Sequence, residues 1–118
     1  MHMFAAFYFV IILTIEKEWS ISYDQLIRLW SLGALLIGLG AIPFGWLSDR
    51  WSRSGTMTIM FIGMGLASIL CGLSTSISFL FLSLSLLGLF CSIYHPVGIP
   101  WVIHSANKQG RALGINGI

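Results

Sequence analysis

A short charged segment between two long apolar runs constrains this chain more than any other feature. The segment covers residues 45–53, between the apolar runs 26–47 and 56–73. The first run holds one charge, Arg28, and the second holds none. A helix of about 20 apolar residues is about 30 Å long, which matches the hydrocarbon core of a bilayer. The pattern therefore predicts two membrane-spanning helices joined by a tight polar turn at the membrane surface.

The composition excludes a water-soluble fold and nucleic-acid binding. The chain has 118 residues, of which 57% are hydrophobic and only 8% are charged. Soluble domains carry about 25% charged residues, so a soluble protein of this composition could not cover its surface. The net charge of +2 comes without a basic run or a set of stacking aromatic residues. We therefore expect an all-α membrane protein whose first partner is the lipid bilayer.

The apolar runs and the polar stretches between them predict four transmembrane helices and the beginning of a fifth. The first run is short for a complete span, but it is not a cleaved signal peptide, because no cation precedes it and no small-residue cleavage site follows. We read the polar stretch 16–25 as a water-facing loop. The fifth segment is only begun within the sequence, so we expect the chain to be part of a longer protein. The predicted helices cover residues 1–15, 23–47, 56–73, 77–104 and 112–118.

Small residues in the second predicted helix are spaced for close helix packing. This helix carries Gly33, Gly38, Gly40 and Gly45. Ala34 and Gly38, and likewise Ala41 and Gly45, stand four residues apart. This spacing lets a neighbouring helix approach closely in lipid, where apolar surface alone does not drive association. In one interpretation the glycines serve only helix packing. In the other they also let the packed helices slide against each other.

The distribution of cations predicts the orientation in the membrane. The loops on one side carry four cations, which are Arg50, Arg53, Lys108 and Arg111. The other side carries two, which are Lys17 and Arg28. Cytoplasmic loops are enriched in Lys and Arg. We therefore expect the loop with Asp49 to be cytoplasmic, in a bacterial inner (plasma) membrane.

The residues of this loop resemble a known signature. Gly45-x-Leu47-x-Asp49-Arg50-x-x-Arg53 is similar to G-x-L-x-D-R-x-G-R-R/K, which the major facilitator superfamily carries between its second and third helices. The resemblance implies twelve helices in two six-helix halves, of which this chain would be part of the N-terminal half. It also implies secondary transport of a small solute by alternating access, without a cofactor and with a coupling ion as a further partner.

Four features depart from or extend this resemblance. Ser52 stands where the family usually has glycine, and Ser54 where a second cation is usual. Residues 81–87 lack the arginine that many members carry there, so the sequence does not support proton-coupled antiport by that residue. Tyr94-His95-Pro96, followed by residues 110–114, resembles the branch that includes fosmidomycin-resistance-type exporters.

Asp49 is the main candidate for a functional residue. A carboxylate at the end of a membrane helix needs a partner, such as Arg50, Arg53 or the positive N-terminus of a nearby helix. The resemblance implies that this aspartate latches the two halves of the carrier on the cytoplasmic side. The alternative is a charge cluster that only fixes the topology.

His95 is the second candidate, together with Tyr94. An ionisable side chain within a membrane helix usually faces protein or a wet cavity, and an imidazole can exchange protons near neutral pH. Pro96 follows directly and frees a carbonyl on the preceding turn, and Pro100 extends the irregular stretch. His95 and Tyr94 therefore either contact substrate or a proton, or only satisfy a local helix break.

The sequence predicts neither an enzyme nor a metal or cofactor site. It contains no metal-ligand cluster, no nucleophile–base pair and no phosphate-binding loop, since Gly110 and Gly114 are not followed by Lys-Ser/Thr. Two alternatives to a carrier fragment stay open. One is a complete four-helix small multidrug exporter acting as a dimer, and the other is a membrane subunit that transports nothing.

Overall fold

The structure, a computed structural model, describes residues 2–116 of the chain. This part contains helices and no strands. The helices are α1 His2–Trp19, α2 Tyr23–Leu29, α3 Ser31–Arg50, α4 Arg53–Gly72, α5 Ile77–Cys91, the π-helix η1 Tyr94–Gly98, α6 Ile99–Ser105 and α7 Gln109–Asn116.

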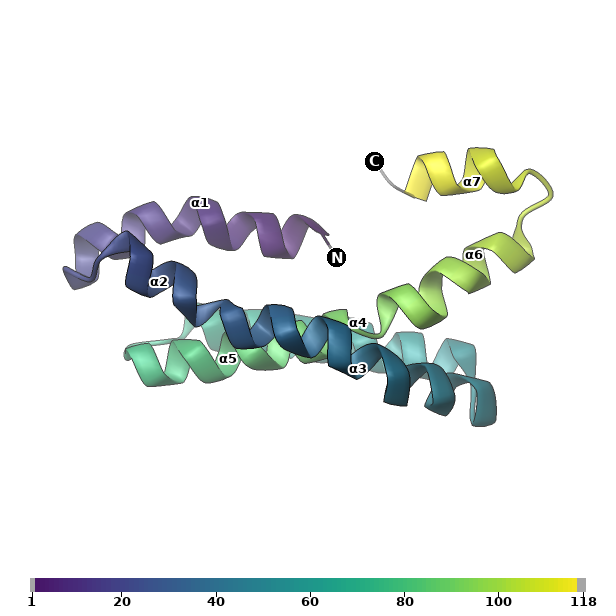
Figure 1. The fold of residues 1–118 in the computed structure, drawn as a ribbon, viewed down its shortest axis with the longest axis horizontal. Helices are drawn as coiled ribbons and strands as arrows, with labels where there is room; N and C mark the ends of the chain where they lie inside the picture. Colours follow the sequence, from purple (N-terminus) through teal and green to yellow (C-terminus); the bar gives the residue numbers. More distant parts are fainter. Residues whose placement is uncertain (1, 117–118) are drawn as a thin grey trace.

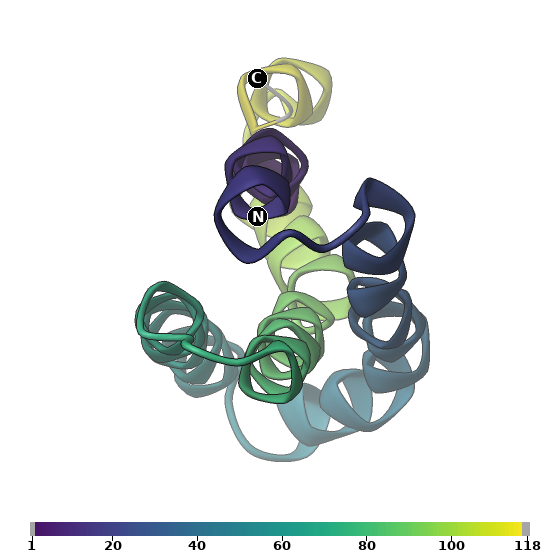
Figure 2. The same cartoon turned by 90° about the vertical axis from the view of Figure 1, so that its left-hand side faces the viewer.

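Helices α3, α4 and α5 run side by side along the long axis of the molecule (Figure 1). Seen end-on, α5 lies between α3 and α4, and it makes the most extensive contacts with both (Figure 2). The α3–α4 and α6–α7 connections lie at one end of this bundle. The α1–α2 and α4–α5 connections lie at the other end (Figure 1). Chain reversals at alternate ends are the arrangement that a multi-pass membrane protein requires.

The number of spanning helices differs from the prediction of four and a beginning fifth. Within the described residues, three helical stretches are long and apolar enough to cross a membrane, namely 23–50, 53–72 and 77–105. Helix α1 does not qualify, because it continues to Trp19 and so includes Glu16, Lys17 and Glu18. The stretch expected to be a loop is therefore largely helical. Helix α7 begins at Gln109, before the predicted 112, and residues 117–118 of that prediction lie outside the described part.

Two of the predicted helices are interrupted. The second bends at Trp30, where α2 ends and α3 begins, and it continues to Arg50. The fourth divides into α5, η1 and α6. Within η1 the Ile99 N–H donates to the carbonyl of Tyr94, five residues back, as in a π-helix. Proline at 96 has no N–H to donate, so a regular hydrogen-bond ladder cannot continue through this stretch. Beyond the break, α6 turns away from α5 (Figure 1) and has no buried residue.

Glycines set the distance between α3 and α5. A Cβ atom built on Gly88 would lie 2.3 Å from the backbone oxygen of Gly33, and one built on Gly40 would lie 2.3 Å from the Ser92 Oγ. Gly33 and Gly40 are about two turns apart on one face of α3. Within the described residues, the expected pair Ala34 and Gly38 makes no close helix contact, because both are exposed and Gly38 faces open space. The face of α3 that packs on α5 therefore carries Gly33 and Gly40, two of the glycines expected to serve packing.

Two groups of buried side chains form the core. The larger joins α4 to α5 and η1, and the smaller joins α1 and α2 to α5. The outward faces of α3 and α4 remain apolar, as expected for surfaces in contact with lipid or with further helices. The larger group is Met57, Met60, Met64, Ala67, Leu87, Cys91, Ile93 and Val97, and the smaller is Tyr8, Ile12, Leu26, Leu80 and Leu84.

Candidate functional site

The α3–α4 connection consists of two residues, Trp51 and Ser52. Ser52 is the N-cap of α4, and its Oγ accepts a hydrogen bond from the Gly55 N–H at 3.1 Å. Its carbonyl accepts from the Thr56 N–H at 2.9 Å and from the Thr56 Oγ1 at 2.8 Å. The φ of Ser52 is −168°, which is extended backbone that any residue adopts. Serine in place of the usual glycine therefore leaves the turn tight and adds a cap to α4.

Two tryptophans pack around this turn. The ring of Trp51 lies over Gly55, where a Cβ atom would come within 2.8 Å of the indole. The guanidinium of Arg50 lies over the ring of Trp46, at 4.6 Å from the centroid. Both indoles are largely exposed, as is typical of tryptophans in the interfacial belt of a membrane. The Arg50 charge is thus placed at the surface by a cation–π contact rather than by an acidic partner.

Asp49 is exposed and lies in the last turn of α3. In the part of the chain that the structure describes, its carboxylate forms no ion pair, and neither Arg50 nor Arg53 supplies the partner expected from the sequence. A negative charge is disfavoured at a helix C-terminus by the helix dipole. The Gly55 N–H in the first turn of α4 is already taken by Ser52. The carboxylate is therefore accessible to a partner outside this turn.

Gly45 packs α3 against the helix break, and Leu47 closes the last turn of α3. A Cβ atom on Gly45 would lie 3.3 Å from the Cβ of Pro96, so the motif helix touches the helix break closely at this point. The carbonyl of Leu47 accepts a hydrogen bond from the Trp51 N–H at 2.9 Å and so closes the last turn of α3. The structure thus brings together two groups that the sequence predicted separately, the loop motif and the break in the fourth helix.

The second candidate pair lies in η1. The Tyr94 and His95 rings are 5.8 Å apart in an edge-on arrangement, with Tyr94 half-buried and His95 exposed. The Tyr94 ring packs over Gly98, where a Cβ atom would come within 2.9 Å of it. Pro100 lies in the first turn of α6, directly after η1, and like Pro96 it has no N–H to donate to the preceding turn.

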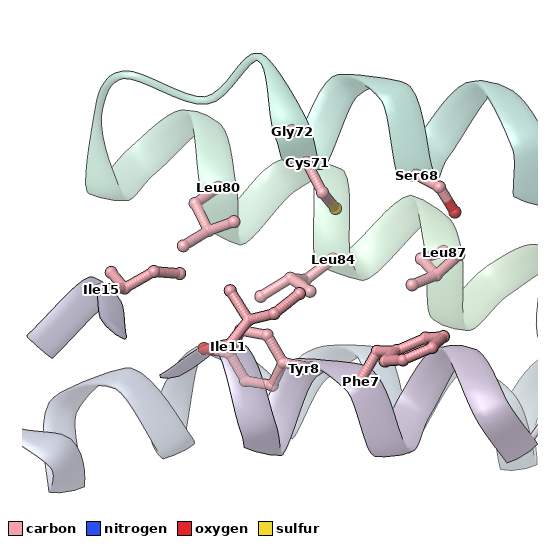
Figure 3. A pocket seen from close by; sticks show the side chains of 10 residues that line it. All are labelled: Phe7, Tyr8, Ile11, Ile15, Ser68, Cys71, Gly72, Leu80, Leu84 and Leu87. Atoms are coloured by element: carbon pink, nitrogen blue, oxygen red, sulfur yellow. The ribbon is translucent and has the colours of Figure 1, made fainter. Parts of the chain in front are cut away.

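An apolar cavity lies between α1, α4 and α5 (Figure 3). Its volume is about 300 Å³, and its few polar groups are already engaged. The Ser68 Oγ donates to the Met64 carbonyl at 2.7 Å, and the Tyr8 hydroxyl donates to the Leu26 carbonyl. Tyr8 was not among the residues predicted from the sequence, although a tyrosine within an apolar run indicates a hydrogen-bond partner nearby. The lining residues are Phe7, Tyr8, Ile11, Ile15, Ser68, Cys71, Gly72, Leu80, Leu84 and Leu87.

Comparison with known proteins identifies the class of protein. The family model described as Major Facilitator Superfamily matches residues 1–118. No curated protein and no solved structure matched the chain. The family match favours neither the four-helix small multidrug exporter nor the subunit that transports nothing.

Proposed function

The chain belongs to the major facilitator superfamily, and we propose on that basis that it is the N-terminal part of a carrier for a small solute. Members of this family are transporters rather than enzymes, and the chain is an integral multi-pass membrane protein. The observation that carries the proposal is the family match over residues 1–118. The expected site motif also stands between two spanning helices, at the α3–α4 connection.

We propose that this carrier has two six-helix halves and that the chain spans the first helices of one half. Two exposed apolar faces support this, one on α3 and one on α4, because a complete bundle can bury one face against a second half while the other meets lipid. The relation to fosmidomycin-resistance-type exporters is also part of the proposal and is supported by Tyr94-His95-Pro96. The exposed apolar residues include Leu35, Leu39, Ile42 and Trp46 on α3, and Phe61, Ile62, Leu66 and Ile69 on α4.

We propose that the α3–α4 connection faces the cytoplasm of a bacterial inner membrane. The α6–α7 connection lies at the same end of the bundle (Figure 1), which gathers the more cationic loops on one side. Such an excess of Lys and Arg is typical of cytoplasmic loops.

We propose that Asp49 is one half of a latch between the two halves of the carrier. The partner would be a donor on the second half, since no residue of the described chain pairs with the Asp49 carboxylate. While this contact is formed, the cytoplasmic side of the carrier is closed. When the contact breaks, the cavity opens toward the cytoplasm. His95 and Tyr94 are proposed as contacts for substrate or a coupling proton, supported by their place in a π-helical break, a common feature of functional sites.

Asp49→Asn is expected to lower transport by the intact carrier about 10-fold or more while leaving insertion and expression normal. Hydrogen bonds to charged groups contribute about 1.5–3 kcal/mol, enough to shift a two-state equilibrium by about 10-fold or more. Asparagine keeps the size of the side chain but removes its charge. The measurement is uptake and efflux in vesicles for the solutes that the intact carrier moves in a screened panel.

Asp24→Asn is the matched control. Asp24 is an exposed aspartate in α2, at the other end of the spanning stretch 23–50. Its carboxylate pairs with Arg28 at 2.9 Å. An exposed ion pair of this kind contributes little, so transport should stay near the level of the unchanged protein. Equal transport by the Asp49→Asn and Asp24→Asn variants would leave Asp49 with a role in topology alone.

A further inference from the structure

The bend at Trp30 changes the hydrogen bonding of one buried carbonyl. In a continuous helix, the Trp30 N–H would donate to the Leu26 carbonyl, four residues back. Instead it donates to the Ile27 carbonyl, three residues back, at 3.1 Å. The ψ of Trp30 is −15°, whereas α-helical residues have ψ near about −42°. The tightened turn takes from Leu26 the donor that a regular helix would give it.

A side chain from the neighbouring helix supplies the replacement donor. The Tyr8 hydroxyl on α1 donates to the Leu26 carbonyl. Tyr8 is 6% exposed and Leu26 is fully buried, so water does not serve this carbonyl. The ring of Tyr8 also packs near the ring of Trp30, with 6.2 Å between centroids. Helix α1 therefore contacts the bend through both a hydrogen bond and a ring.

We propose that the Tyr8 hydroxyl and the Trp30 N–H compete for the Leu26 carbonyl, and that this exchange makes residues 23–50 a two-state hinge. In the bent state, Tyr8 is the donor and α2 tilts away from the axis of α3. In the straight state, Trp30 is the donor and α2 continues α3. The Leu26 carbonyl has a partner in both states, so neither state leaves this buried acceptor bare in an apolar environment. A shift of α1 that withdraws Tyr8 straightens the helix.

The hinge moves α2 as a unit. The Arg28 Nε–Asp24 Oδ2 pair, at 2.9 Å, lies within α2 and does not bridge the bend. Helix α2 has seven residues, which corresponds to a length of about 10 Å. Straightening a kink of more than about 20° displaces the far end of such a segment by about 3–5 Å. This displacement is large enough for distance measurements between spin labels.

The test compares Tyr8→Phe with the unchanged protein in lipid nanodiscs. Spin labels are attached to cysteines at Gln25, on α2, and at Thr75, in the α4–α5 connection, after Cys71 and Cys91 are replaced by alanine. Phenylalanine keeps the ring but removes the donor, so the Leu26 carbonyl must turn to the Trp30 N–H. We expect the 25–75 distance to shift by about 3–5 Å, or to gain a second population displaced by that amount.

Two controls separate a hinge from a general loss of structure. The pair Gly38 and Thr75 lies beyond the bend, and its distance should stay the same in Tyr8→Phe. Tyr23→Phe removes the hydroxyl of an exposed tyrosine at the start of α2 and should leave the 25–75 distance unchanged. An unchanged 25–75 distance in Tyr8→Phe, or a change in both label pairs, would overturn the hinge. The distance measurement requires no transport. Neither result therefore decides the carrier proposal, which is tested by transport of the Asp49→Asn variant.

Discussion

Replacing Gly88 with leucine is expected to lower strongly the yield and the thermal stability of the folded protein. A Cβ atom at this position would lie 2.3 Å from the Gly33 oxygen and 2.5 Å from the Gly33 Cα. These are backbone atoms of α3, so no side chain can rotate away to make room. Overpacking of a core costs about 1–3 kcal/mol and occasionally more, and here α3 and α5 must separate along their shared face. Total stabilities are only about 5–15 kcal/mol, so the loss is a large share of what holds the bundle together.

The measurement is the yield and thermal stability of monodisperse protein in detergent. Gly65→Leu is the matched control, because Gly65 lies on the exposed face of α4 and a Cβ atom there meets nothing within 4 Å. The control should behave like the unchanged protein. A Gly88→Leu variant with the same yield and melting temperature would show that α3 and α5 do not cross as described.

Arginine in place of Ile62 is expected to lower the ratio of inserted to non-inserted chain by about 100-fold. Ile62 is 59% exposed and lies midway along α4. A cation at the centre of a membrane helix costs about 2.5–3.5 kcal/mol of insertion free energy, which corresponds to about 100-fold in the ratio of inserted to non-inserted chain. On the surface of a water-soluble protein, the same exchange would be harmless or would improve solubility. The two environments thus predict opposite results from a single substitution.

The ratio of inserted to non-inserted chain can be measured with a glycosylation or protease-protection assay. Ile62→Leu keeps the apolar character and should insert like the unchanged protein. Arg53→Lys keeps a cation at the interfacial end of the same helix and should also have little effect. Normal insertion of Ile62→Arg would contradict the assignment of α4 as a membrane-spanning helix.

The class of protein could be predicted from the sequence because it depends on local properties. Uncharged runs of membrane-spanning length determine where helices cross, and the polar residues 48–53 determine where the chain reverses. The family motif lies at that reversal, and the family match over the whole chain agrees with it. The extension of α1 to Trp19 was missed, although Glu and Lys favour helices and so do not force a loop at 16–18.

The packing face of α3 and the bend at Trp30 could not be predicted, because they depend on neighbouring helices, whereas the break at Pro96 was predicted from the prolines. Ala34 and Gly38 have the spacing of a packing pair, but α5 approaches the face that carries Gly33 and Gly40. Nothing in residues 23–50 alone marks Trp30 as a bend, since the compensating donor comes from Tyr8 on α1. Spacing along one helix indicates that close packing is possible, and only the partner decides which side is used.

The candidate site could be predicted only in part, because its contacts also depend on neighbouring helices. The residues of the polar turn are contiguous, so the motif located them from sequence alone. The contacts of that turn are not contiguous, and the closeness of Gly45 to Pro96 follows from the packing of α3 on η1. The function of Ser52 as the cap of α4 could have been read from its position, since serine is a preferred N-cap residue.

The most direct test of the account is the side of the membrane on which the α3–α4 connection lies. Cysteines are placed at Ser54, beside this connection, and at Thr75, in the α4–α5 connection, with Cys71 and Cys91 replaced by alanine. A membrane-impermeant maleimide should label position 75 in intact cells and position 54 only in inverted vesicles. Labelling of position 54 in intact cells, or of both positions from the same side, would contradict a cytoplasmic polar turn between two membrane-spanning helices.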